Sequence, residues 1–214
     1  FSVLSFAIIP AAIYVLSYYP YAQAQGDTSP AAWFRAMWDN QIYMFTYHNG
    51  VTDSHPYSSR WYQWLLDIRP ILYYLDTPAP GYTVRFAAFV NPVVCWGGLL
   101  AVLTLAVRAG GWRCGKALFL LIGYLSQLLP WLLIGRITFA YHYFPSVVFL
   151  VLALCYVFNK LMERSPAVRW KPAVWGVTGG AAALYAMFYP VLVGLPVPQW
   201  YTACFLRWFP SWPL

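Results

Sequence analysis

The sequence predicts an all-α polytopic membrane protein with about five transmembrane helices and one long extracytoplasmic loop. Of its 214 residues, 61% are hydrophobic and 21% aromatic, while only 9% are charged. An ordinary soluble domain carries roughly 25% charged residues. A single soluble core of this size does not bury so much apolar surface. The same composition excludes intrinsic disorder, which requires few aromatic residues and many charges.

Five apolar runs come near the length of about 20 residues that a spanning helix needs. The chain begins at Phe1 inside such a run, with no basic flank before it and no cleavage site after it. We therefore expect a truncated first span in a piece of a longer protein, and not a signal peptide. The expected spans are Phe1–Tyr18, Phe86–Val107, Ala117–Ile134, Tyr143–Phe158 and Ala173–Val193.

Prolines, an amide and small residues mark irregular points within these spans. Pro10 predicts a kink in the first span. Gln127 and Pro130 predict a discontinuity in the third span, of the kind that lines a cavity. The run Gly179–Ala183 in the fifth span would let a neighbouring helix approach closely.

The charges predict the orientation, because every acidic and basic residue lies outside the five runs. The loops Arg108–Lys116 and Asn159–Lys171 each carry a net charge of +3, whereas Tyr19–Arg85 carries −1. By the positive-inside rule the two basic loops are cytoplasmic, and the long segment, the Gly135–His142 connection and the C-terminal tail face outward. The net charge of +7 is thus a topology signal, and no nucleic-acid partner is expected.

The chain accordingly divides into a truncated span at 1–18, an extracytoplasmic loop at 19–85 and a four-helix region with an outer tail at 86–214. Within the loop, Ser29 and Pro30 predict a helix N-cap followed by its first residue. From there to His48, large apolar residues recur at helical spacing; they are Phe34, Trp38, Ile42 and Phe45. This stripe predicts a helix lying on the membrane surface. The alternative is a helix packed on the spans themselves.

Two polar and aromatic strings contain the candidate site residues, which are His55, Tyr57 and Arg60 in the first and Arg136, His142 and Tyr143 in the second. Aromatic and imidazole rings suit the faces and hydroxyls of a sugar, and Arg suits a phosphate. Structural interpretations stay open beside these. Arg60 would bind lipid headgroups, Arg136 would be a snorkelling anchor, and His142 would be a hydrogen-bonded packing residue. The four cysteines show no spacing typical of zinc or a disulfide, and no metal site is predicted.

Three motifs resemble a known family. They are HPYSSRWYQW at 55–64, NPVVCW at 91–96 and the R-x-x-F-x-Y-H-Y-x-P pattern of Arg136–Pro145. Together they are similar to the C-terminal membrane region of the protein O-mannosyltransferases, glycosyltransferase family 39 with the GT-C architecture. The resemblance covers about Phe1–Trp208. It departs at Val90, where the family commonly has Gly, and at Cys95. The compact outer loop resembles a bacterial member.

The resemblance implies an inverting enzyme that transfers mannose from a polyprenyl- or dolichyl-phosphate carrier to Ser or Thr of acceptor proteins. It implies a multi-pass protein, dimeric in some members, in the plasma membrane of a bacterium or the endoplasmic reticulum of a eukaryote, with an extracytoplasmic C-terminus. Arg136 would bind the phosphate with His142 and Tyr143 beside it. His55, Tyr57 and Arg60 would line the carrier or sugar site.

The family's catalytic base is an acidic pair that the resemblance places upstream of Phe1, so the chain alone is expected to be inactive. The metal requirement stays open. Two other functions remain: a non-catalytic subunit or assembly factor of the same fold, and a GT-C transferase acting on another glycan or lipid. A transporter is disfavoured, because transporters place charged residues near the membrane midplane and no span here contains one.

Overall fold

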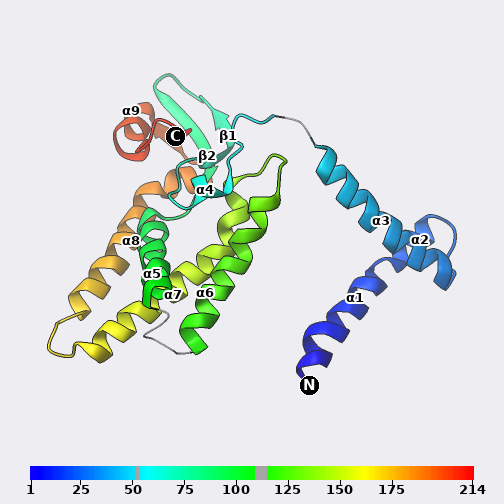
Figure 1. The fold of residues 1–214 in the computed structure, drawn as a ribbon. Coiled ribbons are helices and arrows are strands. Elements are labelled where there is room, and N and C mark those ends of the chain that lie inside the picture. The colour runs from blue at the N-terminus through cyan, green and yellow to red at the C-terminus, as the bar shows by residue number, and fades with distance from the viewer. Residues whose placement is uncertain (52–53, 109–114) are drawn as a thin grey trace. The chain divides into compact units, whose positions relative to one another are not determined.

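The computed structural model describes residues 1–51, 54–108 and 115–214, which fall into two compact units at 1–52 and 53–214 (Figure 1). Arg113 and Cys114 of the first predicted basic loop lie outside the described residues.

The first unit begins with one long apolar helical run, Leu4–Ala24, which is long enough to cross a membrane. It comprises the π-helical turn η1 (Leu4–Ile8), α1 (Ile9–Ser17) and α2 (Tyr19–Ala24). The predicted irregularity at Pro10 is a π-turn: the Ile9 N–H bonds to Leu4 O, five residues back. Pro10 has no N–H for the α-helical bond to Phe6 and crowds that carbonyl, so the preceding turn widens. The run ends six residues beyond the expected Tyr18.

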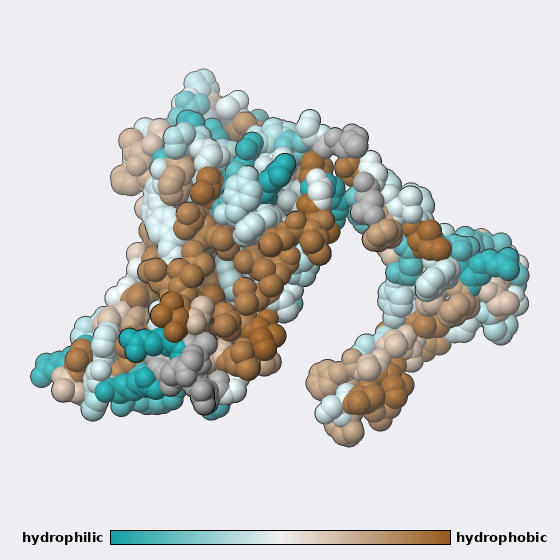
Figure 2. All heavy atoms as spheres, viewed as in Figure 1, coloured by the Kyte–Doolittle hydropathy of each residue, from teal (hydrophilic) through white to brown (hydrophobic). Residues whose placement is uncertain are grey.

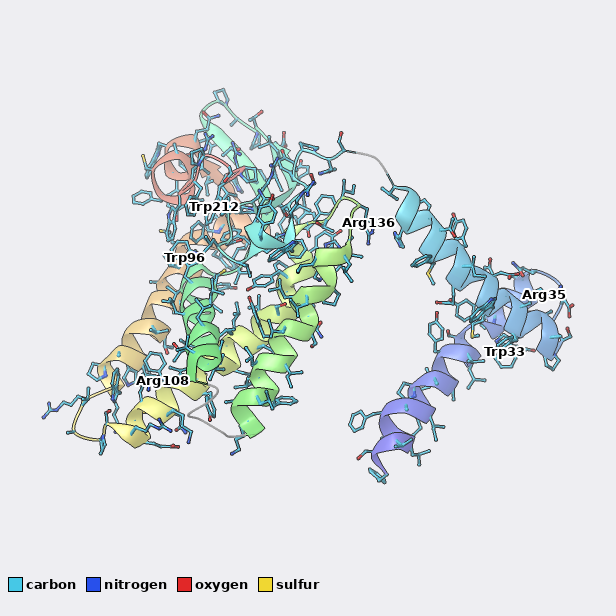
Figure 3. All side chains as sticks on the ribbon, in the orientation of Figure 1. Trp33, Arg35, Trp96, Arg108, Arg136 and Trp212 are labelled. Atoms are coloured by element: carbon cyan, nitrogen blue, oxygen red, sulfur yellow. The ribbon has the colours of Figure 1, made fainter. Side chains whose placement is uncertain are left out.

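Helix α3 (Pro30–Gly50) confirms the helix predicted after Ser29, whose Oγ accepts a hydrogen bond from the Ala32 N–H at 3.3 Å. The helix packs on the spanning run through polar contacts, with Trp33 Nε1 donating to Val15 O at 2.8 Å and Asn40 Nδ2 to the Tyr18 hydroxyl at 2.7 Å (Trp33 is labelled in Figure 3). The predicted aromatic stripe takes no part in this packing, since each of its four side chains is more than half exposed within the unit. Its place in the membrane interface stays a prediction.

The second unit contains a helical bundle of α5 (Pro92–Arg108), α6 (Gly115–Leu128), α7 (Phe144–Arg164) and α8 (Lys171–Val193). Helix α7 packs against both α5 and α6, and α8 packs on α5. Helices α5 and α7 approach closely at Gly98, where an added Cβ would lie 2.5 Å from Leu150 Cβ and 3.1 Å from its Cα. At Gly180, in the small-residue run of α8, the corresponding contact is an ordinary 3.7 Å to Val93. The start of α5 thus contacts the small-residue run of α8, where Asn91 Nδ2 also donates to Ala181 O at 2.9 Å, and α5 crosses α7 closely at Gly98.

Four of the expected spans correspond to helices of sufficient length and apolarity among the described residues: Leu4–Ala24, Gly115–Leu133, Ala140–Arg164 and Lys171–Val193. Helix α5 is apolar but has 17 residues. The expected start of this span at Phe86 was wrong, because residues 86–88 belong to a strand and the helix begins only at Pro92. Figure 2 shows hydrophobic residues gathered over the middle of the bundle and hydrophilic ones at its ends. The predicted discontinuity at Pro130 is the 3₁₀ turn η2 (Leu129–Leu133).

A small antiparallel sheet, in the order β1-β2-β3, corrects the all-α prediction. Its strands are β1 (Ile71–Asp76), β2 (Tyr82–Ala88) and β3 (Pro196–Pro198), with Leu72 opposite Ala87 and Thr83 opposite Val197. The sequence of β1 has no apolar–polar alternation, so the usual strand signal is missing. β3 has only three residues and two of them are Pro.

The C-terminal tail completes a second core against this sheet. After β3 come α9 (Gln199–Tyr201) and the π-turn η4 (Thr202–Leu206), and the chain then folds back over the sheet. The buried members of this core are Leu72, Ala87, Phe89, Phe188, Val191, Leu206, Trp212 and Leu214. The tail is therefore part of the fold that supports the outer loop.

Candidate functional site

The two candidate strings lie side by side in the structure. The Ser59 N–H donates to Thr138 O at 2.8 Å, and Thr138 Oγ1 donates to Ser59 O at 2.6 Å. Both residues are buried. This reciprocal pair joins the loop before α5 to the connection between α6 and α7, which are far apart in the sequence.

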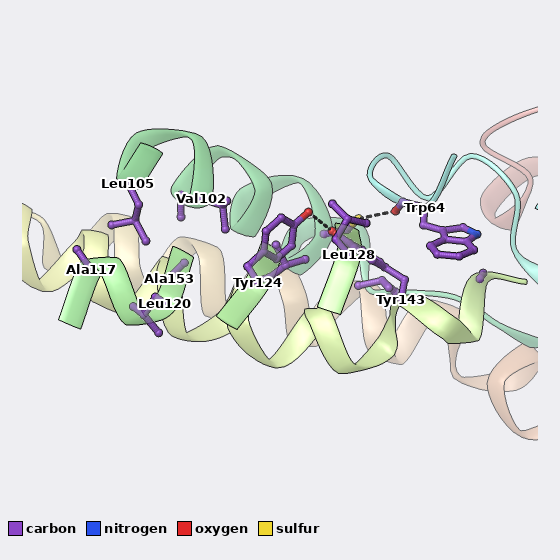
Figure 4. Packing of buried hydrophobic residues seen from close by; sticks show 14 residues of the cluster. Trp64, Val102, Leu105, Ala117, Leu120, Tyr124, Leu128, Tyr143 and Ala153 are labelled. Atoms are coloured by element: carbon purple, nitrogen blue, oxygen red, sulfur yellow. Dashed lines mark hydrogen bonds between the residues drawn. The ribbon is translucent and has the colours of Figure 1, made fainter. Parts of the chain in front are cut away.

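The short helix α4 (Trp61–Trp64) gives the first string its shape. Arg60 is the N-cap of this helix, and its backbone N–H donates to Gln63 Oε1 at 2.8 Å. Trp64 ends it with its indole N–H bonded to Ser59 Oγ at 2.8 Å and its ring buried against the second string. The Trp64 ring lies 6.0 Å from His142 and 5.7 Å from Trp131, centroid to centroid. Figure 4 shows Trp64 at the end of the bundle core.

The strings and η2 enclose a cavity of about 400 Å³. Three arginines line it, Arg60, Arg69 and Arg136, and none of the lining residues is acidic. Two of the guanidinium groups are anchored by carbonyls: Arg69 Nη2 donates to Pro56 O at 2.6 Å and Arg136 Nη1 to Ile137 O at 3.4 Å. Aromatic and hydrogen-bonding side chains complete the lining, among them Trp61, Tyr62, Gln63 and Trp131. Such a cavity suits an anion that carries a ring with hydroxyl groups.

Arg60 and Arg136 are the two predicted site residues that line this cavity. His55 lies nearby on the same string: its ring meets Phe139 at 5.1 Å and its Nδ1 accepts from the Tyr57 N–H at 3.2 Å. Tyr57 is partly buried and packs against the second core. His55 and Tyr57 therefore do not belong to the residues that line the cavity, and their predicted contact with the carrier or sugar stays a prediction.

His142 and Tyr143 lie behind the cavity. The His142 ring is 4.3 Å from Trp131, and its Nδ1 is 3.1 Å from the Phe139 N–H. These contacts are those of the hydrogen-bonded packing residue that the sequence left as an alternative. Tyr143 is fully buried, and its hydroxyl lies 2.8 Å from that of Tyr124, as the dashed line in Figure 4 shows. Their predicted contact with substrate stays a prediction.

Two residues at this site were missed. Arg69 is not among the predicted site residues, although an Arg nine residues after Arg60 in the same loop was a usable signal. Asp67 is not among them either, yet it is 2% exposed and burial raises its pKa to about 8. Among the described residues, no group of three or more His, Cys, Asp or Glu gathers in a way that would hold a metal.

A second, apolar groove of about 440 Å³ lies where α5 and α7 begin. Val94 and Val147 line it, together with Phe89, Val90, Phe144, Val148 and Val151, and Asn91 is its one amide. Asn91 is held by α8, with Nδ2 donating to Ala181 O at 2.9 Å. A surface of this composition suits a hydrocarbon chain.

Comparison with known proteins identifies the family to which this membrane region is similar. The family described as the C-terminal four TMM region of protein-O-mannosyltransferase matches residues 33–212. The polyprenol-phosphate-mannose–protein mannosyltransferase of Mycolicibacterium smegmatis is 28% identical over 97% of this chain and 46% of its own length. Its counterpart in Mycobacterium tuberculosis is 27% identical over 96% of this chain and 45% of its own. The chain thus spans about half the length of these curated relatives.

A solved structure shares the fold. It is the S. cerevisiae protein O-mannosyltransferase Pmt1-Pmt2 complex bound to the sugar donor, with a TM-score of 0.68 over 87% of this chain and 27% of that chain. At 19% sequence identity this likeness concerns the fold alone. The spanning helices, the three motifs and the family match over most of the chain agree, and the resemblance predicted from the motifs is confirmed. This multi-pass membrane chain belongs to the protein O-mannosyltransferase family and corresponds to its C-terminal membrane region.

Proposed function

We propose that this chain forms the donor-binding part of an inverting mannosyltransferase that moves mannose from a polyprenyl-phosphate carrier to Ser or Thr hydroxyls of proteins. The observation that carries the proposal is the cavity lined by Arg60, Arg69 and Arg136 with no acidic side chain in its lining. The donor is a phosphodiester with one negative charge. Transfer of the sugar leaves a phosphate with more charge, so fixed guanidinium groups bind the transition state more tightly than the donor.

The aromatic lining supports a sugar beside that phosphate. Trp61, Tyr62 and Trp131 present ring surfaces, and Gln63 presents an amide. The apolar groove beside Val94 and Val147 is the proposed place for the isoprenoid chain. The resemblance places the base that deprotonates the acceptor hydroxyl outside this chain. Donor binding and leaving-group stabilisation are therefore the share of the reaction that we assign here, and the chain alone is expected not to transfer mannose.

We further propose that the protein lies in a bacterial plasma membrane with the cavity and the C-terminus on the extracytoplasmic side. The two basic loops support this orientation. The curated relatives that match nearly the whole chain are bacterial, and their names give polyprenol-phosphate-mannose as donor and protein as acceptor. We also propose a dimer, because the yeast structure that shares the fold is a Pmt1-Pmt2 complex.

Transfer of radiolabelled mannose tests the function directly. Membranes containing the full-length protein would receive mannosyl-phosphoryl-polyprenol and either a Ser/Thr peptide or the same peptide with Ala and Val in their place. The proposal expects label in the Ser/Thr peptide alone. Label in lipid or glycan and not in peptide would indicate a related transferase with another acceptor. No transfer, with the protein correctly inserted, would indicate the non-catalytic subunit.

A further inference from the structure

The turn that follows α4 is held by side chains from distant parts of the second unit. Four consecutive carbonyls, those of residues 65–68, each accept a hydrogen bond from α5 or from the C-terminal tail. The pairs are Cys95 Sγ to Leu65 O at 3.4 Å, Trp96 Nε1 to Leu66 O at 3.1 Å, Trp212 Nε1 to Asp67 O at 2.8 Å and Ser211 Oγ to Ile68 O. Figure 3 labels Trp96 and Trp212 on their two elements. The turn is thus a junction of three segments.

Asp67 lies at the centre of this junction in an unusual state. Its φ is +53°, the left-handed region that costs a residue with a side chain about 1 kcal/mol or more relative to Gly. Its backbone N–H donates to Trp64 O at 3.1 Å, and its carboxyl accepts the backbone N–H of Val90. The second carboxyl oxygen is buried without a hydrogen-bond partner among the described residues, where no basic side chain pairs with Asp67. A buried, strained and half-satisfied acid is costly, and such residues concentrate at functional sites.

The junction is connected directly to the arginine-lined cavity. On one side of the turn, the Ile68 N–H donates to Gln63 O at 2.9 Å, and Gln63 and Arg60 line the cavity. On the other side, Arg69 lines the same cavity two residues after Asp67. The path of the chain through the turn therefore sets where Arg69 lies relative to Arg60.

We propose that Asp67 is a positioning residue of this cavity: its buried carboxyl, bonded to the Val90 N–H, keeps the turn closed and thereby holds Arg69 in the cavity lining beside Arg60. The inference rests on the proposed function only for the identity of the ligand. Gly at this position would avoid the backbone cost but would lose the bond to Val90. Asn would keep that bond and the uncharged state.

The surroundings explain why the uncharged form is the working one. The titratable groups that face Asp67 are Cys95 of α5 and Tyr143 before α7. The groups from the C-terminal tail, Trp212 and Ser211, do not titrate. None of these carries a positive charge to compensate a carboxylate. Burial raises the Asp67 pKa to about 8, so the acid is uncharged below that pH, and its ionisation above that pH is expected to open the turn.

The test compares Asp67→Asn, Asp67→Gly and a control, Leu66→Ala, whose side chain in the same turn is 48% exposed. Hydrogen exchange in the full-length protein reports on the cavity without requiring activity. Asp67→Gly is expected to speed amide exchange in residues 59–63 and 134–138 by about tenfold. Asp67→Asn and Leu66→Ala are expected to exchange as the wild type does at pH 7.

Kinetics supply the second readout. In mannosyl transfer at pH 7, Asp67→Gly is expected to raise the KM for the lipid-linked donor about tenfold with a smaller change in kcat, while Asp67→Asn stays within about twofold of the wild type. Wild-type activity should fall above pH 8, and that fall should be absent in Asp67→Asn.

The outcomes separate the two proposals. Wild-type exchange in Asp67→Gly, an unchanged donor KM in that variant, or an Asp67→Asn variant as impaired as Asp67→Gly would each overturn the positioning role. If neither the wild type nor any variant transfers mannose but hydrogen exchange changes as expected, the proposed function fails. The positioning role of Asp67 then still stands.

Discussion

At the scale of the residue, the chemistry of this cavity depends on the arginines that line it. Arg60 and Arg69 from the loop before α5 and Arg136 from the connection between α6 and α7 line one cavity without an acidic neighbour in its lining. Guanidinium groups with no carboxylate partner stay available to a phosphate, and their planar donors match its oxygens. The nearby imidazoles of His55 and His142 instead make ring and backbone contacts. The lining therefore has the charge expected of an anion site, with aromatic packing beside it.

Arg136→Ala and Arg60→Ala are expected to lower mannosyl transfer by about tenfold or more, because each removes a charge-assisted contact to the leaving phosphate. Arg169→Ala, which removes an exposed charge from a predicted basic loop, is the control and should leave transfer unchanged. Radiolabel transfer in membranes with matched protein levels measures the effect. Near-normal turnover in both cavity variants would remove these arginines from the site.

The raised pKa of Asp67 also predicts how stability depends on pH. In the unfolded chain the carboxyl ionises at its ordinary pKa near 4, whereas in the folded protein it stays protonated up to about pH 8. Between these values the unfolded state binds fewer protons, so this residue lowers the free energy of unfolding as pH rises and has no further effect above pH 8. Thermal unfolding in detergent between pH 5 and 9 should show this decline in the wild type and a smaller one in Asp67→Asn. Equal slopes would contradict the buried, uncharged state.

At the scale of the element, the bundle depends on a close contact between α5 and α7 at one glycine. Gly98 of α5 faces the backbone and Cβ of Leu150 in α7, where no side chain fits. One residue earlier, an added Cβ at Gly97 would lie 3.8 Å from Leu154, an ordinary contact. The crossing of α5 and α7 thus depends on a single glycine. Helix α5 also carries Cys95 and Trp96, whose side chains donate hydrogen bonds to the turn beside the cavity.

Gly98→Ala and Gly97→Ala form a matched pair for this contact. Gly98→Ala is expected to destabilise the bundle by about 1–3 kcal/mol, the usual cost of overpacking. Gly97→Ala should be neutral or slightly stabilising, since Ala favours a helix by roughly 1 kcal/mol over Gly. Thermal unfolding of the two purified variants in the same detergent compares them. A Gly98→Ala protein as stable as Gly97→Ala would show that the helices do not cross so closely.

At the scale of the whole molecule, the membrane orientation connects the charge pattern to the cavity. The sheet, the cavity and the C-terminal tail belong to the same end of the second unit, while the basic Asn159–Lys171 loop joins α7 to α8 at the other end (Figure 1). This separation is the arrangement that the charge counts require. Under the proposed function, it would place the donor site at one membrane surface.

Single cysteines test the orientation in a background without native cysteines. Ala79→Cys, in the exposed turn between β1 and β2, should react with a membrane-impermeant maleimide in intact cells. Ala167→Cys, in the exposed loop between α7 and α8, should react only after the membrane is opened. The reverse pattern would place the cavity on the cytoplasmic side and contradict the proposed function.

The sequence by itself determined the membrane class, the helix after Ser29, most of the spans and the family, because apolar run length, capping residues and contiguous motifs are local properties. It also singled out Arg60 and Arg136, which the structure places in the lining of one cavity. Only the tertiary structure decided the sheet, the core role of the C-terminal tail, the Gly98 crossing and the places of Arg69 and Asp67. Each of these depends on partners distant in the chain: Trp212 bonds a turn some 145 residues earlier. Burial and strand pairing are created by those partners, and no local pattern in the sequence encodes them.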